Sequence, residues 1–272
     1  MDERINRVAA LANVSRYDAD ATSHYADGAP HIKHASLRTL YGQLLVDVFD
    51  RAKEHTPVPR VLDLGAGEGS VTLPFLELGA RVLAVDSSRT QLDALIGRCG
   101  RFGDMLHTRC EDVADTLGTA ETFDIIAVNS FLHHVPDTLG LVRRAIARLA
   151  PHGQFFSFQD PLRYDSLPRP TLLFDRIAYV SWRIFRGDVL GGLARRLRRS
   201  RGAYRDDSVH DNVEYHVVRN GVDHVALMAS LTQMNLECRL VPYFSTQSRL
   251  FQPVGAALGL KNTFALIART AG

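Results

Sequence analysis

Apolar residues recur with two different spacings between residues 36 and 160, and the two spacings alternate along the chain. Short, nearly continuous apolar runs predict buried strands at 60–64, 81–85, 105–110, 123–128 and 154–158. Apolar positions three and four residues apart predict helices at 36–52, 70–78, 88–98 and 137–150, the last with Asp137 as its N-cap. Strands that alternate with helices indicate an α/β domain with a parallel sheet and right-handed crossovers.

The alternation of predicted strands and helices stops after Pro161, and this change determines the expected organisation of the chain. Residues 161–220 show no strand–helix alternation, whereas a helix at 221–235 and strands at 237–244 and 263–269 are predicted beyond them. Residues 1–36 are polar and are expected to lie outside the core. We therefore expect a single domain over 1–272, with four parts: an N-terminal arm and helix (1–55), a ligand-binding core (56–160), an insert or lid (161–220) and a C-terminal helix and strand pair (221–272).

Cysteine content and hydropathy indicate the expected compartment. Cys99, Cys110 and Cys238 are odd in number and far apart, and they form neither a CxxC pair nor a Cys/His cluster at zinc spacing. We therefore expect no disulfide framework and no metal site. The N-terminus lacks the basic-then-apolar pattern of a signal peptide, and no apolar run approaches the roughly 18 residues of a membrane span. These features predict a soluble protein of the cytoplasm.

Charge is unevenly distributed, although the formal net charge is only +2. Residues 176–205 contain nine arginines and one acid, Asp188, which leaves 23 basic and 29 acidic residues elsewhere. One helical face around the start of this segment is apolar: Leu173, Ile177, Val180 and Ile184. Such a combination suits an anionic membrane surface or an amphiphilic or anionic acceptor, and a solvated helix edge is the alternative. Few aromatic residues interleave with the basic run, which argues against nucleic acid.

An apolar strand at 61–64 runs directly into a glycine-rich turn, and a predicted helix follows it. Gly65 and Gly67 permit a sharp turn and the close approach of a ligand, and the free N–H groups of the helix favour an anion. With Gly69 the spacing is GxGxG, which is shorter than the GxGxxG of dinucleotide sites. It suits a ligand that carries a carboxylate and a nucleoside, and it counts against an oxidoreductase with a nucleotide cofactor.

Polar residues follow the next three predicted strands. Asp86 ends the second strand, and Ser87 follows it. A carboxylate there can accept hydrogen bonds from both ribose hydroxyls; a helix N-cap is the alternative, and the two roles can coexist. After the third strand, Asp112 can accept from an adenine amino group and Val113 can pack on the ring. The fourth strand brings Asn129 to the sheet edge where open α/β sheets bind ligands.

Taken in order, these segments resemble the class I S-adenosylmethionine-dependent methyltransferase family. The resemblance covers 60–160 well and rests on five segments: 63–69, Asp86, Asp112, 123–137 and the turn at 149–153. His152 stands in that turn where many members have glycine. The resemblance implies a Rossmann-like, doubly wound, seven-stranded sheet with the last strand antiparallel and a helical lid or insert. It also implies that Asp63 and Asn129 join the glycines in binding S-adenosylmethionine, which leaves as S-adenosylhomocysteine.

Two histidines and one carboxylate are the candidate catalytic residues. Methyl transfer requires an acceptor atom held in line, and an oxygen acceptor of high pKa also needs a base. His133 and His134 lie just past the fourth strand and are the candidate bases, which their resemblance to the His-His pair of small-molecule O-methyltransferases supports. Asp160, at the end of the fifth strand, is a candidate to orient a hydroxyl or a histidine. The alternatives are a histidine that packs the following helix and a loop acid before Pro161.

The N-terminal arm offers four further polar side chains: Tyr25, His31, Lys33 and His34. In related enzymes such an arm folds over the cofactor, which implies that Tyr25 closes over the methionine portion. His31 and His34 can reach the acceptor from the same arm. Solvated loop residues are the alternative interpretation of all four.

The sequence as a whole predicts a methyltransferase for a small-molecule acceptor. The expected reaction is O-methylation of a specialised metabolite, a sugar or a lipid-like compound. N- or C-methylation and a non-methylating protein that binds S-adenosylmethionine are the alternatives, since the cofactor segments would be the same in each. Methylation of RNA is a weaker alternative, because its main support is the basic segment.

Overall fold

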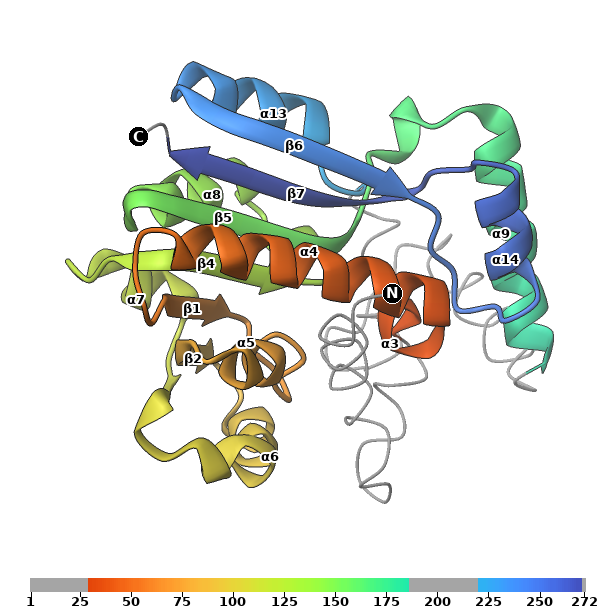
Figure 1. The fold of residues 1–272 in the computed structure, drawn as a ribbon. Coiled ribbons are helices and arrows are strands. Elements are labelled where there is room, and N and C mark those ends of the chain that lie inside the picture. The colour runs from red at the N-terminus through yellow and green to blue at the C-terminus, as the bar shows by residue number, and fades with distance from the viewer. Residues whose placement is uncertain (1–28, 186–219, 271–272) are drawn as a thin grey trace.

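Seven strands form one mixed sheet within residues 29–185 and 220–270, which are the residues that the computed structural model describes (Figure 1). The strands are β1 (Arg60–Leu64), β2 (Arg81–Asp86), β3 (Leu106–Cys110), β4 (Phe123–Asn129), β5 (Leu149–Pro161), β6 (Leu236–Tyr243) and β7 (Thr263–Thr270). Their order is β3-β2-β1-β4-β5-β7-β6, and β7 is antiparallel to both of its neighbours. The Rossmann-like, doubly wound sheet with an antiparallel last strand is therefore confirmed.

Helices cover both faces of this sheet. They are α4 (Ala35–Lys53), α5 (Thr72–Leu78) and α6 (Arg89–Cys99) on one face, and α7 (Val113–Gly118), α8 (Thr138–Ile146) and α13 (His224–Gln233) on the other. Neighbouring residues of β5 serve the two faces, since Phe156 packs in the first core and Phe155 in the second. Because successive side chains of a strand alternate between faces, two covered faces require the nearly continuous apolar runs seen in the sequence.

Five further short helices and one long helix, α9, complete the described chain. They are α3 (Pro30–Lys33), η2 (Gly100–Met105), η3 (Leu132–His134), η4 (Tyr164–Ser166), α9 (Arg169–Phe185) and α14 (Phe251–Ala257). α9 and α14 lie side by side at one end of the molecule (Figure 1), where Phe174 meets Phe251 edge to face at 5.4 Å. Asn262 also donates a hydrogen bond to Asp175 of α9 at 2.8 Å, which ties this helix to the start of β7.

The two ends of the predicted insert meet at the edge of the fold. Leu162 and Val222 form an isolated parallel β-bridge, and Val222 N donates to Pro161 O at 3.0 Å. Beside them Arg163 forms an ion pair with Asp223 at 2.6 Å. The insert therefore leaves and rejoins the domain at one place.

The expectation that residues 1–36 lie outside the core is wrong for the part of this arm that the structure describes. His31, Ile32 and His34 are buried. They are buried because α3 folds back on α4, where the His31 ring meets Tyr41 edge on at 5.6 Å. Tyr25 lies outside the described residues.

Two element boundaries also differ from the prediction. The helix expected over 137–150 begins after its N-cap Asp137, which accepts a hydrogen bond from Gly140 N at 2.8 Å, but it ends at Ile146. Leu149 instead pairs with Phe123 of β4, so sheet pairing overrides helical periodicity there. In the predicted insert, the 17-residue helix α9 contains Leu173, Ile177, Val180 and Ile184, as the helical spacing of these residues indicated.

Two kinds of feature are absent from the described part of the chain. None of its helices combines the length and the apolar character needed to cross a lipid bilayer. None of its groups of His, Cys, Asp and Glu side chains brings together three that could hold a metal ion.

Candidate active site

The glycine-rich turn after β1 adopts the backbone conformation that its glycines permit. Gly65 and Gly67 have φ of 69° and 51°, in the left-handed region. Gly65 N and Ala66 N both donate to Val85 O, which fixes the turn against β2. A Cβ atom at Gly65 would lie 2.3 Å from the ring of Phe131, whereas one at Gly67 would meet nothing within 4 Å. Gly65 is thus required for packing, and Gly67 borders open space.

Asp86 joins this turn to the loop after β2. One carboxylate oxygen accepts a hydrogen bond from Gly67 N at 2.9 Å, and the other accepts from Ser88 N at 2.8 Å. The N-cap of α6 is Ser88, whose hydroxyl accepts from Gln91 N. Ser87 is exposed between them. The structure therefore gives the capping role to Ser88 and places Asp86 against the glycine turn.

Asp112 and Val113 begin the helix after β3. Asp112 is the N-cap of α7, and its Oδ1 accepts a hydrogen bond from Ala114 N at 2.7 Å. Its side chain is exposed, and Val113 is half-buried against the second core. Capping uses one carboxylate oxygen of Asp112, so the second oxygen is available to a ligand.

Asp63 is completely buried at the end of β1. Its Oδ2 accepts a hydrogen bond from Thr72 Oγ1 at 2.6 Å, while its Oδ1 has no hydrogen-bond partner among the described residues. Burial raises the pKa of this carboxyl to about 7. Because buried acceptors in folded proteins are nearly always paired, the unmet oxygen is an unusual feature that a ligand with a donor would satisfy.

Asn129 ends β4, on the other side of β1 from Asp86. Its amide nitrogen lies 3.0 Å from His31 Nε2 and 3.1 Å from Ser70 Oγ. The sheet order β3-β2-β1-β4-β5 therefore places Asp112, Asp86, the glycine turn and Asn129 along one edge, at the carboxyl ends of successive strands. Neighbouring strands lie about 4.8 Å apart, so these side chains span the length of a nucleoside with an amino-acid extension.

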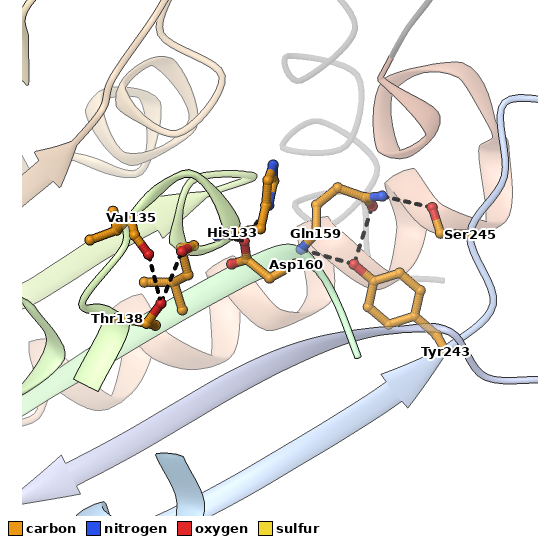
Figure 2. A network of polar contacts seen from close by, with 8 residues as sticks. His133, Val135, Thr138, Gln159, Asp160, Tyr243 and Ser245 are labelled. Atoms are coloured by element: carbon orange, nitrogen blue, oxygen red, sulfur yellow. Dashed lines mark hydrogen bonds and ion pairs between the residues drawn. The ribbon is translucent and has the colours of Figure 1, made fainter. Parts of the chain in front are cut away.

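His133 and Asp160 meet at the ends of β4 and β5 (Figure 2). His133 Nδ1 lies 2.8 Å from Asp160 Oδ1, and the backbone N–H of His133 donates to the same oxygen at 3.2 Å. Both side chains are buried. Burial lowers the pKa of His133 to about 3 and raises the pKa of Asp160 to about 7. At neutral pH the imidazole is therefore uncharged, and above about pH 7 its Nδ1–H donates to the ionised Asp160 carboxylate.

His134 differs from its neighbour although both lie in η3. His134 is exposed, and its ring centroid lies 4.1 Å from that of His133 with the rings tilted at 47°. The structure brings His133 and Asp160 together in a buried pair, and the exposed His134 ring lies beside His133.

Gln159 precedes Asp160 near the end of β5, and it was not identified from the sequence as a site residue. Its φ is 65°, and the pairing of β5 with β7 shifts register between Ser157 and Asp160. Its side chain shares hydrogen bonds with Tyr243 and Ser245, and Tyr243 Oη also accepts from Gln159 N at 3.0 Å (Figure 2). No local pattern marks Gln159, because its partners lie 84 and 86 residues away.

Comparison with known proteins gives one family and several partial relatives. The model of the methyltransferase domain family matches residues 33–229. The ubiquinone biosynthesis O-methyltransferase of Methylocella silvestris is 33% identical over 98 residues, which are 36% of this chain and 38% of that protein. Its counterpart from Coxiella burnetii is 30% identical over 96 residues, 35% of this chain and 41% of that one. The chain thus matches about two fifths of the length of these relatives.

Solved structures share the whole fold at low identity. The magnesium protoporphyrin IX methyltransferase from Synechocystis, solved with bound S-adenosylmethionine, has a TM-score of 0.51 at 13% identity and covers 100% of this chain and 99% of that one. The plantazolicin methyltransferase, solved with S-adenosylhomocysteine, has a TM-score of 0.51 at 12% identity over 99% of this chain and 98% of that one. Identities this low support a common fold only.

Proposed function

The chain belongs to the methyltransferase domain family, of the class I type that uses S-adenosylmethionine, and from this premise we propose that it methylates an oxygen atom of a small molecule. The observation that carries the proposal is the buried His133–Asp160 pair at the ends of β4 and β5. An oxygen acceptor of high pKa needs a base where its proton is lost. An amine acceptor needs only to be neutral and correctly oriented. A histidine that is held in place by a carboxylate therefore favours an oxygen acceptor over an amine.

The glycine turn and the polar residues beside it in β1 and β4 fit S-adenosylmethionine. This cofactor supplies a methyl group that is already activated by the sulfonium charge. The fit rests on two buried oxygens without partners among the described residues, Asp63 Oδ1 and Asn129 Oδ1, and on the open space at Gly67. Both oxygens can accept from an ammonium group. We infer that the nucleoside is held by residues after β2 and β3: Asp86, Ser87, Asp112 and Val113.

His133 is the proposed base, and Asp160 orients it. The Nδ1–H group of His133 donates to Asp160, so the basic lone pair is on Nε2. In the proposed reaction Nε2 takes the proton that the acceptor hydroxyl loses. The Asp160 carboxylate then stabilises the imidazolium that forms, as in a Ser-His-Asp triad.

This arrangement implies a definite dependence of rate on pH. Burial raises the pKa of Asp160 to about 7, so the carboxylate that stabilises the imidazolium is present above this pH. We expect kcat to rise through about pH 7 and then to level off. Asp160→Asn should lower kcat and remove this inflection, while Asp165→Asn, at an exposed acid in η4, should leave the profile unchanged. An inflection that persists in Asp160→Asn would contradict the assignment.

The outer face of α9 supports an amphiphilic acceptor. Four apolar side chains on this face are 49–61% exposed: Leu173, Ile177, Val180 and Ile184. A groove of about 510 Å³ is lined by three of them together with Arg176 and Ser181. Apolar side chains beside a guanidinium suit a molecule with an apolar tail and an anionic group, or an anionic membrane surface. The relatives in ubiquinone biosynthesis support a small-molecule acceptor.

A cytoplasmic location is part of the same proposal. Cys99, Cys110 and Cys238 are all free thiols. Free thiols are expected in a reducing compartment.

Two measurements test the proposal in sequence. In calorimetric titrations we expect micromolar affinity for S-adenosylmethionine and S-adenosylhomocysteine, and no binding of NADH. A labelled methyl donor is then offered with paired acceptors that share a carbon skeleton and differ only in carrying a hydroxyl or an amine. Transfer to the hydroxyl member supports O-methylation. Transfer to the amine alone would replace it with N-methylation, and cofactor binding without transfer to any acceptor would favour a binding role.

A further inference from the structure

His31 is a buried polar residue that the proposed reaction does not use. Its side chain comes from α3 and is 1% exposed. The ring packs edge on against Tyr41 at 5.6 Å and against Phe158 at 6.0 Å. Burial lowers its pKa to about 3, so the ring is neutral and has one nitrogen that donates and one that accepts.

The amide of Asn129 is oriented with its nitrogen toward His31 and Ser70. This nitrogen lies within hydrogen-bond distance of two groups that can accept from it, His31 Nε2 at 3.0 Å and Ser70 Oγ at 3.1 Å. An amide nitrogen has two protons, so both of its donors are used. The carbonyl oxygen of Asn129 is buried and has no partner among the described residues. His31 and Ser70 together therefore present that oxygen as an unmet acceptor.

The arrangement also leaves His31 itself incompletely satisfied. When Nε2 accepts from Asn129, the ring proton is on Nδ1, and this nitrogen is buried without a partner in the part of the chain that the structure describes. Unpaired buried polar atoms, here His31 Nδ1 and Asn129 Oδ1, reduce stability. A ligand that donates to Asn129 Oδ1 would offset the part of this loss that comes from Asn129.

The sheet order indicates which part of the cofactor would reach Asn129. The residues proposed for the nucleoside lie at the ends of β2 and β3, on one side of β1, and Asn129 lies one strand beyond β1 on the other side. Asp63, with its own unmet oxygen, ends β1 between them. The amino-acid portion must therefore extend toward β4, where its ammonium group has three protons for these two oxygens.

We propose that His31 is a positioning residue, which fixes the amide of Asn129 so that Oδ1 accepts from the ammonium of the methionine portion of the cofactor. This inference rests on the proposed use of S-adenosylmethionine. It gives the N-terminal helix a role in cofactor affinity, exerted through one side chain.

Two ligands separate this role from general support of the fold. S-adenosylhomocysteine carries the amino-acid portion, and 5′-methylthioadenosine has the nucleoside and sulfur without it. Calorimetry on His31→Leu should show affinity for S-adenosylhomocysteine reduced by about tenfold or more, the range for loss of a hydrogen bond to a charged group, with affinity for 5′-methylthioadenosine unchanged. Asn129→Ala should show the same selective loss.

Two further variants keep the test valid if the leucine substitution lowers stability. His31→Gln places an acceptor near the position of Nε2 and should restore most of the affinity, whereas the shorter side chain of His31→Asn should not. His34→Leu is the matched control, because His34 flanks the same helix but contacts Thr246 O at 2.7 Å. It should leave the ratio of the two affinities unchanged.

The outcomes distinguish the inference from the function on which it rests. Equal losses for both ligands in His31→Leu, or no loss for either, would overturn the role of His31 and leave the methyltransferase proposal standing. The same conclusion follows if His31→Asn restores affinity better than His31→Gln. Failure of the unmodified protein to bind either ligand would overturn both.

Discussion

The two halves of the candidate site are built from contacts of different range. Around the glycine turn the partners are close in sequence, with Thr72 and Asp63 nine residues apart and Gly67 and Asp86 separated by 19. On the acceptor side the contacts join more distant segments, since His133 and Asp160 are 27 residues apart and Gln159 and Ser245 are 86 apart. The glycine-turn part of the cofactor site is thus a local unit, whereas the acceptor half exists only once the whole domain has folded.

This difference has a mechanistic meaning. A local unit can keep one geometry while its surroundings change, which suits a cofactor that is the same for a whole family. Long-range contacts allow each pair of loops to be altered separately, which suits a variable acceptor. If the two halves are independent, a substitution in one should alter its function and spare that of the other.

The largest expected effect is on the acceptor half. His133→Ala should lower kcat by about 10²- to 10⁴-fold, the usual contribution of a positioned general base, with affinity for S-adenosylhomocysteine changed less than twofold. Single-turnover assays with calorimetry measure both. The matched control is His134→Ala, at the exposed neighbour, which should lose less than tenfold. Equal losses in the two variants would show that the buried pair has no special role.

The next effect is on the cofactor half. Asp86→Ala should weaken cofactor binding by about 10²-fold, because it removes a carboxylate proposed to accept two hydroxyl protons and also frees Gly67 N. The fold should remain intact, with an unchanged circular dichroism spectrum. Asp115→Ala, at an exposed acid in the first turn of α7, is the control and should bind normally. Unaltered affinity in Asp86→Ala would remove the ribose assignment.

A third prediction concerns stability and pH in the cofactor half. Burial raises the pKa of Asp63 to about 7, so the folded chain holds this proton and loses stability as pH rises from about 4 toward 7. Asp63→Asn lacks the charge, so its stability relative to the unmodified protein should be greater at pH 8 than at pH 5, by on the order of 2 kcal/mol. Urea denaturation at both pH values measures the difference. A pH-independent difference would contradict the raised pKa.

The smallest expected effect is on the outer face of α9. Replacing Ile177 and Val180 with Ser should raise KM for an acceptor with an alkyl tail by about tenfold and leave KM for its tail-free analogue unchanged, because the exposed apolar groove is lost. Leu258→Ser, at an exposed apolar residue after α14, is the control. A uniform rise in KM for both acceptors would exclude a tail-binding role.

Much of the cofactor half was predictable, because its signals are local. Glycines at 65 and 67 predict left-handed backbone, and Asp137 predicts the start of a helix. An acid at the end of an apolar run predicts a ligand at the edge of the sheet. The same sequence pattern could not tell whether Asp86 or Ser88 caps α6, since both choices satisfy the same local rule.

The contacts between distant segments were less predictable for a physical reason. His31 reads as a polar arm residue, and only the packing of α3 against Tyr41 and Phe158 buries it. Gln159 reads as an ordinary strand residue, and its left-handed φ depends on Tyr243 and Ser245, which are distant in sequence. Interactions of this kind leave no periodicity, so they become visible only in the folded chain.

The bridge between Leu162 and Val222 has a consequence for how such a protein can change. Since the chain leaves and rejoins the domain at adjacent positions, what lies between them can be lengthened, shortened or exchanged at a closure cost that grows only slowly with its length. Recombination at these two points would exchange the segment that contains α9, which is proposed to contact the acceptor, and would leave the glycine turn, Asp86 and the order of the sheet untouched. Replacement of the one segment between Leu162 and Val222 can thereby change which substrates a protein of this fold accepts.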